Sequence, residues 1–176
     1  VYKIEAWKDP SLWFMKAKSR ISAYPPEEKI PASFKDWNIW CGPKEMVPFS
    51  SRYHTGGWRG FHKYGCGMFG DWGCHIIDFV HDYLNLGLPT EISPVRLADH
   101  NKVIFPLTSH IKFQFPERGP RFPAVELMWK AGLDCRPVID EKYGDVQKDG
   151  SVRIPELNNA GTLIHRKQGD YAILRG

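Results

Sequence analysis

The segment that most restricts the fold is residues 65–78, where a glycine-rich turn leads directly into a helix. The helix is predicted over residues 68–86, because Gly87 and Pro89 then end it. Apolar residues recur within it at the three- and four-residue spacing of one helical face, which is expected to pack on the core. These residues are Ile76, Phe79, Val80, Tyr83 and Leu84.

Segments that alternate between apolar and polar residues supply a sheet. Residues 108–115 and 123–130 are expected to form an antiparallel hairpin. A turn at residues 167–169 is expected to join the strands at residues 161–165 and 171–174. The sequence therefore predicts an α+β fold, in which an open, mostly antiparallel β-sheet has one principal helix packed on a face. The whole chain, residues 1–176, is expected to be a single domain. The predicted strands are residues 1–7, 89–98, 108–115, 123–130, 161–165 and 171–174.

Two stretches have few signs of regular structure. Residues 8–65 are rich in Trp, Pro, Gly and charge, and we interpret them as a long loop region within the domain. Ordered loops of this length usually have a function. Within this region, residues 33–43 are predicted to form a short helix that Ser33 caps and Gly42 ends. The polar residues 135–158 are predicted to form a second loop.

The three glycines of residues 65–70 have the Gly-x-Gly-x-x-Gly spacing of dinucleotide-binding proteins, and Glu91 lies where that motif has its acidic residue. The motif must follow a buried strand, whereas residues 57–64 are rich in glycine, aromatic and basic residues. Asp71 would also place a carboxylate where the helix must receive a pyrophosphate. We therefore interpret the glycines as a turn that lets the helix approach its neighbours closely.

Asp71, His75 and Asp78 are candidate functional residues, because offsets of four and three place them on one face of an α-helix. An imidazole flanked by carboxylates suits a general base that removes a proton from a hydroxyl. From the residues alone, a helix cap beside a structurally bonded histidine is equally compatible with this pattern. Zinc or manganese could also use these ligand types, but the spacing differs from that of helical zinc motifs, and no metal is predicted.

Trp58 and Arg59 precede the glycine turn and are further candidates for ligand binding. An Arg side chain suits a carboxylate or phosphate, and a Trp ring suits the face of a sugar. The alternative is that both anchor the loop, with the indole buried and the guanidinium bonded to backbone carbonyls. Tyr53 and His54, just upstream, fit the anchoring role better.

Charge and cysteine content exclude several classes of function. The net charge is +4 and the basic residues are dispersed, so nothing indicates nucleic-acid binding. The sequence has no apolar run of about 18 residues, so no membrane span is predicted. The four cysteines, at positions 41, 66, 74 and 135, lack zinc-ligand spacing and are expected to be free thiols.

The chain begins and ends on strand-like residues, so we expect it to be part of a longer protein.

The ordered combination of motifs resembles a known family. Residues 36–43 (Asp-Trp-Asn-Ile-Trp-Cys-Gly-Pro), residues 58–60 (Trp-Arg-Gly) and residues 65–78 are together similar to the C-terminal domain of Gfo/Idh/MocA oxidoreductases. The resemblance extends over most of the chain. It implies that an N-terminal Rossmann domain, absent from this sequence together with the family's catalytic lysine, binds NAD or NADP. It also implies that the open sheet builds the site for a sugar or polyol substrate.

The resemblance assigns roles to individual residues. His75 would be the base that takes the hydroxyl proton while hydride passes to the nicotinamide, and Asp71 would orient the substrate and the base. The substrate-binding side chains would be Asp78, Trp58, Arg59 and Trp72. Without the Rossmann domain, the chain is expected to be inactive.

Alternatives to a dehydrogenase follow from the same resemblance. Some relatives use NAD-linked oxidation to cleave glycosidic bonds, and Asp71 and His75 would serve that reaction equally well. A non-catalytic module that binds carbohydrate or joins subunits is a second alternative. The family resemblance further implies a homo-oligomer assembled through the open face of the sheet. It is compatible with a cytoplasmic or an exported protein.

Overall fold

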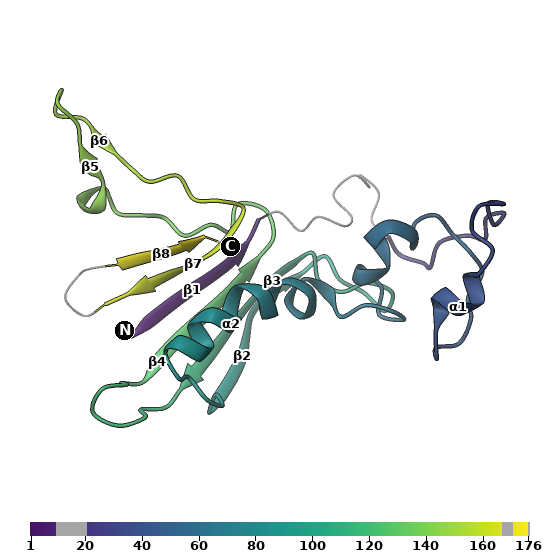
Figure 1. Cartoon of the computed structure of the whole chain (residues 1–176), viewed down its shortest axis with the longest axis horizontal. Helices are drawn as coiled ribbons and strands as arrows, with labels where there is room; N and C mark the ends of the chain where they lie inside the picture. Colours follow the sequence, from purple (N-terminus) through teal and green to yellow (C-terminus); the bar gives the residue numbers. More distant parts are fainter. Residues whose placement is uncertain (10–20, 167–170, 176) are drawn as a thin grey trace.

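The computed structural model describes residues 1–9, 21–166 and 171–175. Figure 1 shows α2 lying across the sheet, while α1 and the segment around it extend beyond one end of the sheet. The helices are α1 (Trp37–Cys41) and α2 (Cys74–Tyr83), the 3-10 turns η1 (His54–Gly60) and η3 (Glu141–Tyr143), and the π-helical turn η2 (Phe69–Gly73). The strands are β1 (Lys3–Lys8), β2 (Glu91–Ala98), β3 (Thr108–Phe115), β4 (Val125–Ala131), β5 (Asp145–Val146), β6 (Val152–Arg153), β7 (Ala160–His165) and β8 (Tyr171–Arg175).

The main sheet has six strands in the order β2-β3-β4-β1-β7-β8. β1 pairs parallel with β4 and antiparallel with β7, and the other pairs of this sheet are antiparallel. β5 and β6 form a separate ribbon. α2 lies on one face and contacts β1 and β7. The predicted α+β fold, with an open, mostly antiparallel sheet and one principal helix on a face, is confirmed.

All six predicted strands are present, with shifts of no more than two residues at their ends. β3 has the predicted bounds, and its antiparallel pairing with β4 confirms the predicted hairpin. β2 has a bulge between Pro94 and Arg96. Proline lacks an N–H to donate, so it is tolerated on this edge strand. The turn predicted at residues 167–169 lies outside the described residues. The loop predicted after β4 contains the short elements η3, β5 and β6.

The main core lies between α2 and the sheet. Residues of β1 alternate between the two faces, so Ile4 and Ala6 pack under α2 while Trp7 packs on the opposite side. The hydroxyl of Thr162 on β7 donates a hydrogen bond to the Ile76 carbonyl at 3.0 Å. This buried bond joins the helix to the sheet in addition to their apolar contacts.

α2 ends at Tyr83 in a Schellman motif. The Leu86 N–H donates to the carbonyl of His81 and the Asn85 N–H donates to that of Asp82, both at 2.9 Å. Asn85 has the left-handed backbone that this motif requires, with a φ of 48°. The prediction of a helix that continues to Leu86 was wrong, because Asn is one of the few residues besides Gly that adopt this conformation readily.

The predicted apolar face of α2 is only partly buried. Ile76 and Val80 are in the core and Leu84 packs against it, but Phe79 and Tyr83 are exposed. The two exposed rings stack on each other, with centroids 5.8 Å apart. The prediction was wrong for these two residues, because they lie at the border of the helical face, where a neighbouring ring replaces the core as packing partner.

The described part of the predicted loop region, residues 21–65, packs with Val103 and Ile104 in a second core that is rich in aromatic rings. The Trp37 ring centroid lies 4.5 Å from that of Trp40 in a stacked pair and 5.2 Å from that of Phe49 in an edge contact. A segment with little regular structure is therefore ordered by ring packing. The buried members of this core are Ile21, Trp37, Cys41, Val47, Phe49, Tyr53, Phe61, Val103 and Ile104.

The short helix α1 lies within the predicted range 33–43. Its N-cap residue is Asp36, which makes no side-chain cap bond, so the prediction that Ser33 caps it was wrong. Gly42 ends the helix as predicted, with a φ of 64°.

Two glycines of the turn before α2 allow close packing. A Cβ on Gly65 would lie 2.0 Å from the carbonyl oxygen of Arg59. Gly67 has a φ of 69°, and a Cβ there would lie 2.8 Å from the side chain of Phe105. These contacts confirm the interpretation of the glycines as a turn that approaches its neighbours closely.

We expect Gly67→Ala to destabilise the domain more than Gly87→Ala. The two glycines have nearly equal φ angles, 69° and 67°, but a Cβ on Gly87 would meet no non-neighbouring atom within 4 Å. Backbone strain should cost about 1–2 kcal/mol at either position, and crowding against Phe105 should add about 1–3 kcal/mol at Gly67. Urea unfolding of both variants measures these free energies. Equal losses would mean that Phe105 moves aside without cost.

Glu5 is a buried carboxylate on the sheet face opposite α2, surrounded by basic side chains. Its oxygens lie 2.7 Å from Lys130 Nζ, 2.9 Å from His165 Nε2 and 3.6 Å from Lys3 Nζ. Burial raises the pKa of Glu5, but the hydrogen bond and charge of Lys130, the charge of Lys3 and the bond with His165 outweigh it. The pKa of this carboxyl therefore lies below its ordinary value.

The stability that Glu5 supplies should disappear in acid. A carboxyl whose pKa is lowered by folding stabilises the protein above its unfolded pKa, near 4.5, and stops doing so as the pH falls through the folded value. Glu5→Gln should therefore cost about 3 kcal/mol at neutral pH, and the cost should shrink below about pH 5. Urea unfolding of both proteins across this range tests the expectation, which a pH-independent cost would contradict.

Candidate active site

The predicted site residues lie on two kinds of helical turn. Asp71 and Trp72 are in the π-helical turn η2, whereas His75 and Asp78 are in α2. A π turn is wider than an α turn, so the α-helical spacing that grouped these residues does not apply across η2. Single π turns inside α-helices are frequent at functional sites.

Arg59 binds Asp71. Its guanidinium Nε lies 2.9 Å from Asp71 Oδ1, and the two side chains are 35% and 26% exposed. The same guanidinium lies over the Trp58 ring, 4.5 Å from its centroid. The structure thus brings together three of the predicted residues. It also connects the end of η1 to η2, so that the loop before the glycine turn and the start of the helix form one unit.

His75 is exposed and lies beside Trp72. The two ring centroids are 6.4 Å apart in an edge-to-face arrangement. Within the described residues His75 makes no hydrogen bond to Asp71 or Asp78, because Asp71 binds Arg59 and Asp78 is turned to solvent. The carboxylate–imidazole bond expected from the spacing is therefore replaced by ring packing against Trp72. The ring nitrogens remain open to a substrate.

Lys8 is a neighbour of these residues that the sequence analysis missed. Its ammonium lies 4.6 Å from the centroid of the Trp72 ring. A signal was present in the sequence, since alternation along β1 places Lys8 on the same face as Ile4 and Ala6, at the end of an otherwise apolar row.

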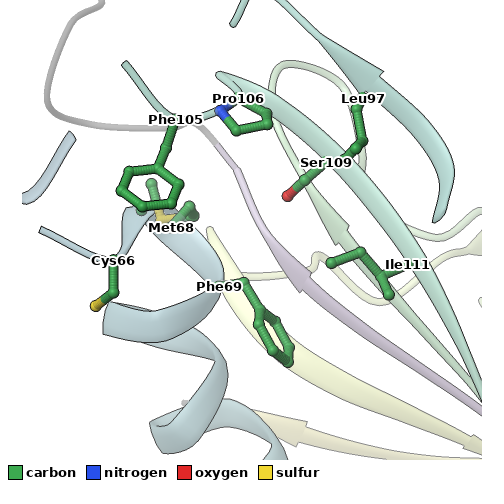
Figure 2. A pocket seen from close by; sticks show the side chains of 9 residues that line it. Cys66, Met68, Phe69, Leu97, Phe105, Pro106, Ser109 and Ile111 are labelled. Carbon is green, nitrogen blue, oxygen red and sulfur yellow. The ribbon is translucent and has the colours of Figure 1, made fainter. Parts of the chain in front are cut away.

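An apolar hollow of about 250 Å³ lies beside the start of the helix, and it contains none of the predicted site residues (Figure 2). A polyol site needs several hydrogen-bonding groups, whereas Ser109 supplies the one side-chain hydroxyl among the residues that line this hollow. We therefore place the candidate site on the exposed side of η2 and α2. The hollow is lined by residues 66–69, Leu97, Phe105, Pro106, Ser109 and Ile111.

The described residues do not fit a bound dinucleotide or metal ion. The glycine turn follows η1 and a further turn in place of a strand, and Asp71 lies at the start of the helix where a phosphate would bind. No three His, Cys, Asp or Glu side chains gather at a metal site in the described parts of the chain. The four cysteines are free, as predicted. No helix among the described residues is long and apolar enough to cross a membrane.

A family model for GFO/IDH/MocA proteins, described as "Oxidoreductase family, C-terminal alpha/beta domain", matches residues 11–102. The match covers more than half of the chain and includes every predicted site residue. The chain belongs to this family. The predicted resemblance to Gfo/Idh/MocA oxidoreductases is confirmed, and the mostly antiparallel sheet with α2 on one face is consistent with their C-terminal domain. No curated protein matches the sequence.

The Arg59–Asp71 ion pair should contribute modestly to stability. Because both side chains are about one-third exposed or less, a double-mutant cycle with Arg59→Met and Asp71→Asn should give a coupling energy of about 0.5–1 kcal/mol in urea unfolding. The pair Lys63–Glu45 is a matched control, since its atoms are 3.3 Å apart but the Glu45 side chain is 84% exposed. A coupling no larger than the control's would argue against a persistent pair in solution.

Proposed function

We propose that this domain supplies the substrate side of a nicotinamide-dependent oxidoreductase that acts on a hydroxyl of a sugar or polyol. The family match supports an oxidoreductase. The proposal depends on one observation, the exposed imidazole of His75 next to the Trp72 ring, with 6.4 Å between centroids. An aromatic ring beside an accessible base suits a sugar, since the apolar face of the sugar packs on the ring while a hydroxyl meets the base.

In this proposal His75 is the general base, and a ring nitrogen takes the proton of the substrate hydroxyl. NAD or NADP supplies the hydride acceptor. Because the glycine turn does not fit its phosphates, we assign the cofactor to a nucleotide-binding domain of the full-length protein, without which this domain would be inactive.

Asp71 and Arg59 orient the substrate. Arg59 binds Oδ1 of Asp71 at 2.9 Å, and no described residue binds Oδ2, which can accept a hydrogen bond from a second hydroxyl. The Trp58 ring packs against the same guanidinium. Asp78 and Trp72 complete the set of substrate contacts.

We also propose a homo-oligomer that forms through the sheet face opposite α2. The principal helix α2 lies on the other face (Figure 1), and the segment with η3 borders this face only beside Leu163 and His165 of β7. Lys112 and Met128 continue the row of Glu5 across β3 and β4 and are only half-buried. A partly exposed face of mixed charge and apolar groups suits pairing with a second copy.

The test is His75→Ala in the full-length protein, assayed by NADH or NADPH formation with a panel of hexoses, inositols and hexuronates. Loss of the base should lower kcat/KM by about 10²–10⁴-fold. His100→Ala is the matched control, since His100 is exposed and should leave activity unchanged. A loss below about threefold would contradict the role of His75. Cleavage of a glycoside without net NADH would identify the glycosidase alternative.

A further inference from the structure

Lys8 is a buried cation at the edge of the candidate site. It is the last residue of β1, and only 3% of its surface is exposed. Burying an ammonium ion is costly unless a partner compensates it. A lysine is therefore unusual on this face of β1, where the other side chains are Ile4 and Ala6.

Among the described residues, Lys8 contacts an aromatic ring and has no ion-pair partner. Its Nζ lies 4.6 Å from the Trp72 centroid. The adjacent Asp9 is bound by Arg136 at 3.0 Å. Burial lowers the pKa of Lys8, and the charge of Asp9 only partly opposes this. Residues 10–20, which follow directly in sequence, contain no Asp or Glu.

The Lys8 ammonium is not completely enclosed by the described residues. Among the described residues, Arg118 Nε is the one fully buried side-chain nitrogen or oxygen without a hydrogen-bond partner. Lys8 Nζ makes no hydrogen bond there either, so it must keep some contact with solvent. Its charge thus lies in a nearly buried position, where the charges of Asp9 and Arg136 act on it in opposite directions.

The Trp72 ring connects Lys8 with His75. The distances of 4.6 Å from the ammonium and 6.4 Å from the imidazole, both to the Trp72 ring centroid, place the two groups no more than 11 Å apart. One monosaccharide with its substituents spans a gap of this order. A single substrate can therefore present a hydroxyl to His75 and another group to Lys8.

We propose that Lys8 binds the carboxylate of an acidic sugar, so that the substrate of this site is a sugar acid. The inference rests on the proposed function, since it names the substrate class of the same site. In a poorly hydrated position an unpaired ammonium attracts an anion far more strongly than in water. A single cation balances the single charge of a carboxylate, whereas a phosphate dianion needs more donors than Lys8 offers.

The test compares D-glucuronate with D-glucose, which differ only at C6. This carbon is a carboxylate in glucuronate and a hydroxymethyl group in glucose. In isothermal titration calorimetry of the full-length protein at neutral pH, glucuronate should bind at least about tenfold more tightly. Lys8→Met should abolish this preference and leave glucose binding unchanged, and Lys8→Arg should retain part of it. Lys44→Met, at an exposed lysine, should behave like the unmodified protein.

Thermal unfolding separates this role from a structural one. If Lys8 is kept for binding, replacing the buried charge with Met should raise Tm by about 2–4 °C; a fall in Tm would overturn the proposal. Equal affinity for the two sugars, binding of neither, or a preference that survives Lys8→Met would overturn it as well. These results concern only Lys8, because the proposed function is tested separately by hydride transfer and His75→Ala.

Discussion

The pairing of β1 with two distant strands is the interaction on which the rest of the structure depends. β1 aligns Lys3–Lys8 with Glu126–Ala131 on one side and with Ala160–His165 on the other. It thereby joins the antiparallel β2-β3-β4 unit to the β7-β8 hairpin. Its alternating side chains serve both faces, with Ile4 and Ala6 in the core under α2, and Glu5 and Trp7 on the other side.

The candidate site depends on this arrangement. α2 is held on the sheet by apolar contacts and by the hydrogen bond from Thr162, and η2 extends the helix over the end of β1, where Lys8 meets Trp72. The Arg59–Asp71 pair then attaches the preceding loop. Lys8 of β1 and His75 of α2 thus lie against the Trp72 ring, and the charged groups of this region differ in their partners. Asp71 is neutralised by a neighbour, whereas Lys8 has no carboxylate partner among the described residues.

Local sequence patterns predicted the fold class well, because strands and amphipathic helices depend on periodicities that a reader can count. The bounds of β3 and the turn around Gly65 and Gly67 followed from such patterns. The end of α2 did not, because Asn85 was not recognised as a left-handed residue. Phe79 and Tyr83 were misplaced because counting spacing does not reveal that two rings can stack outside the core.

The residues of the candidate site were predicted better than the contacts between them. The motif placed Arg59, Asp71 and His75 in one region, and the family match contains all three. The π turn and the pairing of Arg59 with Asp71 could not be predicted from the sequence. Both depend on how the loop before the glycine turn packs back on the helix. Lys8 was missed because it lies more than 60 positions from Trp72 in sequence.

The central position of an early strand also has a consequence for how the chain folds. The β2-β3-β4 meander and the β7-β8 hairpin involve neighbouring segments, but β1 gains both of its partners only from residues far along the chain. Such high contact order slows folding, because a long loop must close before the pairing repays its entropy. Until β7 is in place, one edge of β1 has unpaired N–H and C=O groups. A chain interrupted before residue 160 would thus leave an open sheet edge, prone to pairing with other chains.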